Sequence, residues 1–248
     1  MDDANIRLHR LLFVSTLIAT FFGMPRKRPY HHPNLRKALL EAAVILIGEV
    51  GPKGFTIREV ARRAGVSHNA PYRHFRDKDE LLEAVAIEGF QRLTDAMKKG
   101  SVAGKTAAER LRLCGRGYVD FALHWPQHFL VMFDLPSREL PRNEAVGENA
   151  FQTLLGFIME SQKEGTLPAG DPHPLALMAW SMVHGIAKLA ISGNLPYTSR
   201  QVLDFTQHAS EAFVSGMGNL KWPGKFSCKR ESPGKTEKNG LRRVTSAQ

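Results

Sequence analysis

This 248-residue sequence is poor in cysteine, and what it lacks narrows its function. Its two cysteines, Cys114 and Cys228, form neither a CxxC pair nor the spacing of a zinc site. A disulfide-stabilised secreted fold and a metal site are therefore not expected. A phosphate-binding glycine loop, a Gly-x-Ser-x-Gly turn and an HExxH pair are also absent. We therefore expect a protein that is not an enzyme and needs no cofactor.

The N-terminal part of the chain contains one hydrophobic run, and it is shorter than a membrane span. The apolar run over residues 11–24 follows Arg7 and Arg10, as in a signal peptide, but it is too short to span and lacks a clear cleavage site. We expect residues 1–29 to be an N-terminal extension, with Met24 as the true start. The alternative is a membrane-associated arm. A cytoplasmic protein without a membrane partner is the favoured interpretation.

Alternating apolar and polar residues, the pattern of a half-buried strand, are not found in the chain, whereas helical periodicity is frequent. The sequence therefore predicts an all-α fold. A first helix is expected from Asn34 to Gly51 and a longer one from Asp77 to about Lys99. The remaining expected helices cover residues 107–124, 126–134, 144–164, 174–192 and 199–216.

The most informative stretch is residues 56–78, which is typical of a helix-turn-helix. Thr56 and Glu59 have the spacing of a capping box, which predicts that a helix begins here. Gly65 can end that helix with a positive φ. Ser67 is expected to cap a second helix that starts at His68 and closes with Phe75. Two short helices joined by a three-residue turn containing glycine form a DNA-binding motif.

The outward-facing residues of the second helix predict how DNA is bound. His68 and Asn69 stand at its N-terminal end, which enters the major groove, so they are the expected base readers. Hydroxyl, ring and cationic donors nearby suit phosphate oxygens. The expected backbone contacts are Arg36, Thr56, Ser67, Tyr72, Arg73, His74 and Lys78. Packing of Tyr72 in the core and solvation of His74 are the alternatives for those two residues.

Residues 35 to about 93, beginning LRKALLEAAVILIGEVGPKGFTIREVARRAGVSHNAPYRHFRDKDELLEAV, resemble the N-terminal domain of the TetR family of bacterial transcriptional regulators. Two later stretches, YVDFALHWPQHFLVMFD and WSMVHGIAKLAISGNL, resemble a C-terminal variety found in that family. The resemblance implies a homodimeric, ligand-responsive regulator, more often a repressor, that binds a palindromic DNA operator. It also implies that the last two long helices form the dimer seam. Residues 68–71 fall on variable positions, so no operator sequence is implied.

A small-molecule effector site is expected in the helical module, where large apolar residues accompany few polar groups. Core packing explains the same residues equally well. The candidates are Phe121, Trp125, Phe129, Met132, Phe133, Phe157, Trp180 and His184. A structural hydrogen bond is the alternative for His184.

Charge is distributed unevenly along the chain, whose formal net charge is +10. Residues 1–75 and 218–248 are net basic, whereas residues 76–217 are net acidic. This pattern favours double-stranded DNA as the partner of the N-terminal part, although a nonspecific nucleoid-type binder is an alternative. The predicted organisation is a DNA-binding domain over residues 30–80, an effector and dimerisation domain over 81–218, and a basic disordered tail over 219–248.

Overall fold

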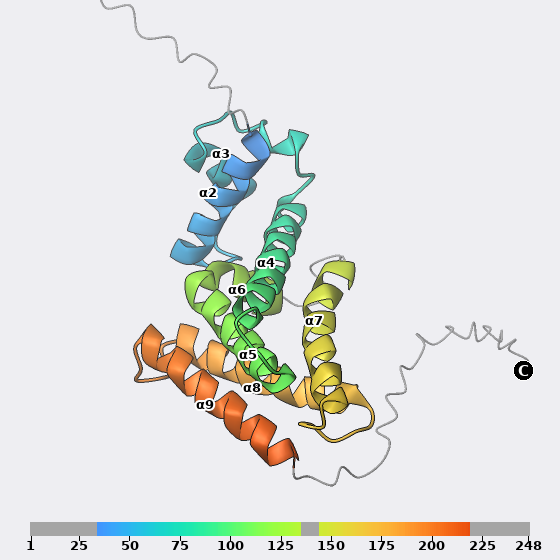
Figure 1. The fold of residues 1–248 in the computed structure, drawn as a ribbon. Coiled ribbons are helices and arrows are strands. Elements are labelled where there is room, and N and C mark those ends of the chain that lie inside the picture. Colours follow the sequence, from blue (N-terminus) through green and yellow to red (C-terminus); the bar gives the residue numbers. More distant parts are fainter. Residues whose placement is uncertain (1–33, 135–143, 219–248) are drawn as a thin grey trace, which may run out of the picture. The chain divides into compact units, whose positions relative to one another are not determined.

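The structure is a computed structural model that describes residues 34–134 and 144–218, and the regular elements in these two ranges are all helical. The predicted all-α fold is therefore confirmed. The elements in chain order (Figure 1) are α2 (Leu35–Val50), α3 (Ile57–Arg63), the 3-10 helix η1 (Pro71–Arg73), α4 (Lys78–Ser101), α5 (Ala107–His124), α6 (Pro126–Asp134), α7 (Glu144–Lys163), α8 (Pro172–Ile191) and α9 (Ser199–Gly218). The expected N-terminal extension, the basic tail and Cys228 lie outside the described residues.

Local capping signals set the ends of α2 and α3 where the sequence predicts them. The Asn34 side chain accepts from the amide of Lys37 at 3.1 Å, and Gly51 ends α2 with a φ of 77°. Thr56 and Glu59 form the reciprocal capping box at the start of α3. Gly65 follows that helix with a φ of 69°, a conformation that favours glycine.

The second helix of the motif differs from the α-helix predicted after Ser67. Residues 67–70 form a turn, and only residues 71–73 are helical, as the 3-10 helix η1. Pro71 has no amide hydrogen, so it cannot donate to the carbonyl of Ser67. The amide of Ala70 donates to that carbonyl instead, at 2.9 Å. No side-chain cap is present at η1, so the predicted capping role of Ser67 was wrong.

The start of α4 uses a variation of the predicted capping box. The Asp77 carboxylate accepts from the amide of Glu80 at 2.9 Å, as expected. The Glu80 carboxylate accepts from the amide of Arg76 at 2.6 Å and also pairs with the Arg76 guanidinium. These contacts hold the chain between Phe75 and α4 in a defined path.

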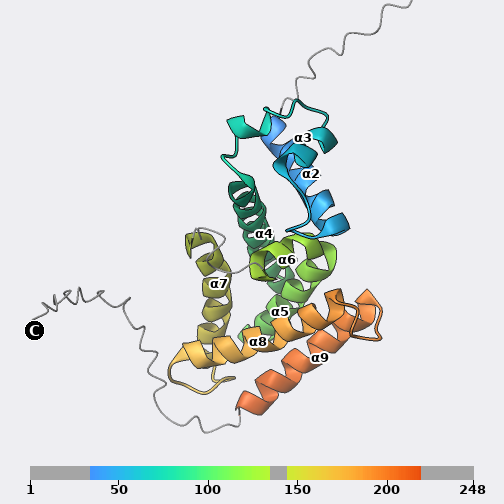
Figure 2. The same cartoon turned by 180° about the vertical axis from the view of Figure 1, so that it is seen from behind.

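The later helices begin and end within two residues of their predicted bounds, because proline, glycine and cap residues punctuate them. Asp171 caps α8 by accepting from the amide of His173 at 3.0 Å. The two last helices, α8 and α9, pack side by side, as Figures 1 and 2 both show. Of the described helices, only α8 is long and apolar enough to span a membrane by length and composition. About a third of this apolar stretch is buried inside the protein.

The described chain divides into two compact units. Unit 1 comprises residues 34–95, 120–134 and 144–150, and unit 2 comprises residues 96–119 and 151–218. The helix-turn-helix therefore shares its unit with α6 and with much of α4. Within unit 1, α6 approaches α2 where Gln127 lies against Gly48, and it approaches α4 where Met132 lies against Gly89. A Cβ atom on Gly89 would stand 2.5 Å from the Met132 sulfur, so a larger residue here would force the Met132 side chain to move.

Candidate nucleic-acid interface

The segment Ser67–Phe75, called the recognition segment below, is anchored by its apolar residues and exposes its polar ones. Pro71 and Phe75 are buried. The exposed members of the segment are Ser67, His68, Asn69, Tyr72, Arg73 and His74. Tyr72 exposes 49 % of its surface, which argues against packing in the core. The structure therefore places both expected base readers and four expected phosphate contacts on one exposed segment.

Phe75 is the principal anchor of this segment, with 2 % of its surface exposed. Its amide donates to the carbonyl of Pro71 at 2.9 Å, which closes the short helical turn. The guanidinium of Arg36, at the start of α2, lies 5.4 Å from the centre of the Phe75 ring. Arg36 is itself exposed, so this cation lies next to the recognition segment and stays accessible.

Thr56 has an internal role that the sequence reasoning also identified. Its hydroxyl donates to the Glu59 carboxylate at 2.9 Å and accepts from the Glu59 amide at 3.3 Å. The Thr56 amide donates to the same carboxylate at 2.7 Å, which lowers the pKa of the Glu59 carboxyl from its ordinary value. The Thr56 side chain is thus part of the cap that starts α3, and a phosphate contact by it stays a prediction.

The structure directs the Lys78 ammonium into the protein rather than away from it. Its Nζ atom donates to the carbonyl of Phe55 at 2.8 Å and to the carbonyl of Lys53 at 3.2 Å. The same atom lies 4.4 Å from the centre of the Phe55 ring. Partial burial lowers the pKa of the ammonium, and the nearby carboxylates of Asp79 and Glu59 act in the opposite direction. Nothing in the sequence near Lys78 signals this long-range contact.

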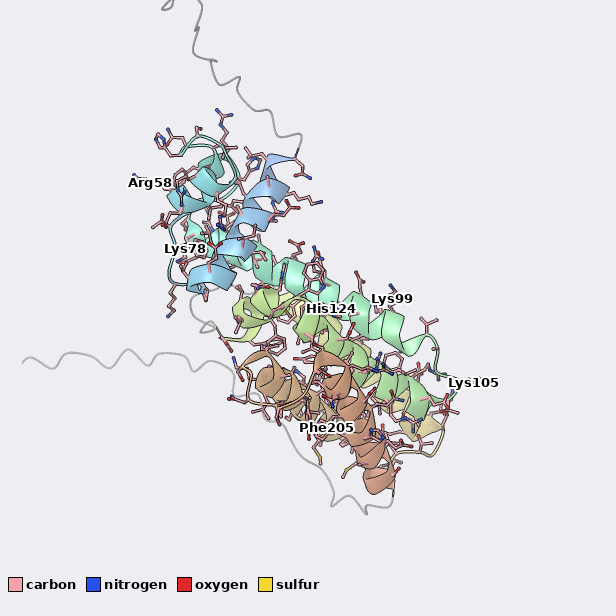
Figure 3. All side chains as sticks on the ribbon, turned by 90° about the vertical axis from the view of Figure 1, so that its left-hand side faces the viewer. Arg58, Lys78, Lys99, Lys105, His124 and Phe205 are labelled. Carbon is pink, nitrogen blue, oxygen red and sulfur yellow. The ribbon has the colours of Figure 1, made fainter. Side chains whose placement is uncertain are left out.

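Other cations of the helix-turn-helix differ in whether a carboxylate already neutralises them. Arg63 pairs with Glu49 across α3 and α2 at 2.7 Å. Arg58, in the first turn of α3, is exposed and forms no ion pair within the described residues (Figure 3). Sequence reasoning missed Arg58 as a phosphate-binding candidate. Its position two residues after the Thr56 cap was the available signal, because the first helix of such a motif crosses the DNA backbone.

The expected effector residues divide between the two units. Phe121, Trp125, Phe129, Met132 and Phe133 belong to unit 1, whereas Phe157, Trp180 and His184 belong to unit 2. Phe121, Phe129 and Met132 are buried, whereas Trp125 is exposed and the other four are half-buried. In unit 1, the ring of Phe133 contacts those of Phe129 and Phe90.

In unit 2, Tyr118 joins two of the expected effector residues in a polar aromatic cluster, defined as Tyr118, Trp180 and His184. The Trp180 Nε1 donates to the Tyr118 hydroxyl at 3.2 Å. The Tyr118 oxygen lies 2.9 Å from Nδ1 of His184. The Tyr118 hydroxyl has one hydrogen and two lone pairs, so the tautomer of His184 decides which of the two groups donates in this contact. Burial raises the pKa of Tyr118. Sequence reasoning did not identify Tyr118, which lies 66 residues from His184.

His128, on α6 in unit 1, contrasts with His184. Only 2 % of its surface is exposed, and neither ring nitrogen has a hydrogen-bond partner. Its Nε2 lies 4.0 Å from the Glu88 carboxylate, which is also paired with Arg92. Burial lowers the pKa of the His128 imidazole from its ordinary value, with Glu88 opposing the shift.

Cys114 is fully buried, as expected, and burial raises the pKa of its thiol to about 12. The thiol therefore stays protonated, which makes it a poor nucleophile and metal ligand. Within residues 34–134 and 144–218, no group of three or more His, Cys, Asp or Glu residues is placed to hold a metal ion.

Two parts of this chain match the sequence patterns of described protein domain families. "Bacterial regulatory proteins, tetR family" matches residues 39–85, and "Tetracyclin repressor-like, C-terminal domain" matches residues 111–213. The first match contains α3 and the recognition segment, and the second contains the polar aromatic cluster.

Individual relatives agree with these matches. The HTH-type transcriptional repressor Rv3405c of Mycobacterium tuberculosis is 42 % identical over 60 residues, which are 24 % of this chain and 32 % of the relative. The chain therefore aligns with about a third of the length of this curated relative. A Rhodococcus sp. RHA1 structure of unknown function is 34 % identical with a TM-score of 0.67, covering 77 % of this chain and 100 % of that one.

A further solved structure shares the fold. The regulator FadR of Bacillus subtilis, in complex with stearoyl-CoA, is 18 % identical with a TM-score of 0.64. The alignment covers 73 % of this chain and 98 % of FadR.

Proposed function

This chain belongs to the TetR family of bacterial transcriptional regulators, and on that premise we propose that it is a ligand-responsive repressor whose homodimer reads a palindromic operator. DNA binding through the helix-turn-helix is the property of the family. We propose three further properties. They are base reading by His68 and Asn69, a homodimer, and a small-molecule effector.

The observation that carries the proposal is the setting of His68 and Asn69. Both side chains are exposed at the start of the recognition segment, and neither forms a hydrogen bond with another described residue. Their donors and acceptors are therefore available to base edges, where Asn pairs well with adenine. Buried Pro71 and Phe75 hold the segment on the unit.

A homodimer is supported by the apolar side chains that α8, α9 and the connection between them expose. Large exposed apolar groups in contiguous elements are typical of protein interfaces. In this part of unit 2 they are Leu177, Met178, Leu189, Tyr197 and Phe205. A twofold dimer built on these helices would present two recognition segments, and twofold symmetry in the protein requires a palindromic DNA site.

The effector proposal rests on the aromatic and polar groups of the helical module. Such a ligand acts by binding more tightly to the conformation that cannot dock on DNA. FadR was solved with stearoyl-CoA, so acyl-CoA thioesters of different chain lengths are the first compounds to test. Release of operator DNA on addition of one of them, at unchanged salt, would identify an inducer.

The remaining parts of the proposal are a cytoplasmic location and the absence of catalysis and of cofactors. A nonspecific nucleoid-type binder is the alternative function. It would bind all duplexes alike and lose affinity steeply with salt. The exposed pair His68 and Asn69 favours the specific regulator, because a protein that binds only phosphates needs no side chains suited to base edges.

Selection from random duplex DNA with the purified full chain tests the proposed function. The expected result, at near-physiological salt, is enrichment of one palindrome bound by two protein chains. Equal recovery of all sequences by folded protein would refute sequence-specific regulation. Repeating the selection with His68→Ala and Asn69→Ala then asks whether these residues determine the enriched bases.

A further inference from the structure

The Lys78 side chain connects the two ends of the helix-turn-helix. Lys78 is the first residue of α4, and the carbonyls of Lys53 and Phe55 that it contacts precede α3. The contact between Lys78 and Phe55 spans 23 positions in the sequence, and these positions include the whole recognition segment. A single side chain thus joins the residues that enter and leave the DNA-binding motif.

The turn that receives Lys78 is tightly constrained. Gly54 lies between the two carbonyls, and a Cβ atom on it would stand 2.2 Å from the carbonyl oxygen of Val50. Phe55 is buried, with 3 % of its surface exposed, and its ring also contacts the ammonium. The ammonium of Lys78 donates to both carbonyls, and its contact with the Phe55 carbonyl is partly buried, so it stabilises this backbone conformation.

The same contacts limit what else the ammonium can do. Of its three donors, two are directed to the carbonyls of Lys53 and Phe55. A strong phosphate contact at this position would require the ammonium to leave the Phe55 ring and at least one carbonyl. Arg36 and Arg58 on the same motif are exposed, so a phosphate contact by either of them would not require this loss.

We propose that Lys78 is a positioning residue for DNA recognition: it fixes the start of α4 to the turn before α3, so that the recognition segment between them is held in its DNA-reading conformation. This inference rests on the proposed function of specific DNA binding. It assigns Lys78 an effect on affinity that does not come from neutralising a phosphate.

Salt dependence separates the two roles of a lysine. Each phosphate contact contributes about 0.9 to the slope of log K against log salt, so losing one lowers the slope by that amount. Lys78→Met keeps the length of the side chain but removes the donors and the charge. The matched control is Lys99→Met, which removes an exposed lysine from the same helix at a position with no assigned DNA role (Figure 3).

The measurement is operator affinity at several salt concentrations for wild type and the two variants, with unfolding midpoints measured in parallel. Lys78→Met is expected to weaken binding about tenfold with the salt slope of wild type, while Lys99→Met changes neither. Lys78→Arg, which keeps donors and charge, is expected to recover part of the lost affinity. Because the proposed homodimer carries two copies of Lys78, a slope lowered by about 1.8 in Lys78→Met would overturn the inference in favour of a phosphate contact. A lower unfolding midpoint with unchanged affinity would overturn it in favour of a purely structural role.

Amide hydrogen exchange tests the inference without DNA. In Lys78→Met, the amides of Ala70, His74 and Phe75 are expected to exchange faster than in wild type and Lys99→Met, because each donates within or just after the recognition turn. Unchanged protection at all three would show that Lys78 does not hold the segment. Failure of the wild type to select any DNA sequence would instead remove the proposed function, so the two failures are distinguishable.

Discussion

The recognition segment and the polar aromatic cluster use similar side chains in opposite ways. Both contain histidine and tyrosine. In the recognition segment, His68 and Tyr72 are exposed, and neither is hydrogen-bonded to another described residue. In the cluster, the Tyr118 hydroxyl is bonded to both Trp180 and His184, and Tyr118 is buried.

This difference separates groups available for an external partner from groups that stabilise the fold. A buried polar group must find its partner within the protein or lose free energy, whereas an exposed one exchanges water for a partner at little cost. The recognition segment therefore keeps its specificity in exposed side chains and its stability in buried Pro71 and Phe75. Substitutions in the two regions should accordingly separate stability from DNA recognition.

The largest effect is expected from Phe75→Ala, which removes the anchor of the recognition segment. Truncating a buried phenylalanine costs about 3–5 kcal/mol because the lost side chain leaves a cavity. Urea unfolding followed by circular dichroism measures this loss. The control Ile45→Ala truncates an exposed apolar side chain on α2 and should change stability by less than about 0.5 kcal/mol. Equal small effects would show that Phe75 is not an anchor.

Tyr118→Phe is expected to destabilise the protein by about 1–3 kcal/mol, since it removes the hydroxyl that Trp180 and His184 share. The operator affinity of the folded variant should match that of wild type. The matched control for stability is Tyr72→Phe, at a tyrosine with 49 % of its surface exposed, where little change in unfolding is expected. If both tyrosine variants unfold at the wild-type urea concentration, the cluster does not stabilise the fold.

A smaller effect is expected from Thr56→Ala, which removes the cap of α3. Loss of an N-cap hydroxyl costs about 0.5–2 kcal/mol. Thr56→Ser keeps the hydroxyl and should retain most of the stability. Thermal unfolding of both variants decides the matter, and an alanine variant as stable as the serine variant would contradict the capping role.

The smallest change in stability is expected from His128→Leu. Unlike the preceding substitutions, it should stabilise the protein. Removing two buried ring nitrogens without partners should raise stability by about 1 kcal/mol. The pKa of His128 is lowered in the folded state, so the unfolded chain binds the proton first as pH falls below the ordinary value of 6.5. Wild-type stability should therefore decline from about pH 6.5 towards the lowered folded pKa.

Urea unfolding of wild type and His128→Leu at pH 8 and pH 5.5 measures this difference. The variant should lose less stability than wild type over this interval, because it lacks the buried imidazole. Equal losses in the two proteins would show that His128 does not contribute to the pH dependence.

Helix ends were predictable from sequence because their signals are local. Asn34, Gly51 and the Thr56–Glu59 pair each act within four residues of the helix end that they define. The predicted α-helix after Ser67 was wrong, although Pro71 carried a usable signal, since a missing amide favours a short turn.

Contacts between distant residues could not be predicted in the same way. The carbonyls that receive Lys78 and the hydroxyl that joins Trp180 to His184 come together only when the chain folds. Lysine at the start of a helix and tyrosine within one are both common, so neither residue type indicates such a partner. The exposure of His68 and Asn69 was predictable because the spacing of buried residues around them sets the outward face.

The central claim is that His68 and Asn69 read bases while Tyr72 only holds the DNA backbone. The most direct measurement is the affinity of wild type, His68→Ala, Asn69→Ala and Tyr72→Ala for the selected operator and for all of its single-base variants at one salt concentration. The first two substitutions should remove about 1–3 kcal/mol of discrimination at particular base pairs, whereas Tyr72→Ala should weaken binding to every duplex alike. Equal loss on every duplex for His68→Ala and Asn69→Ala would contradict the claim.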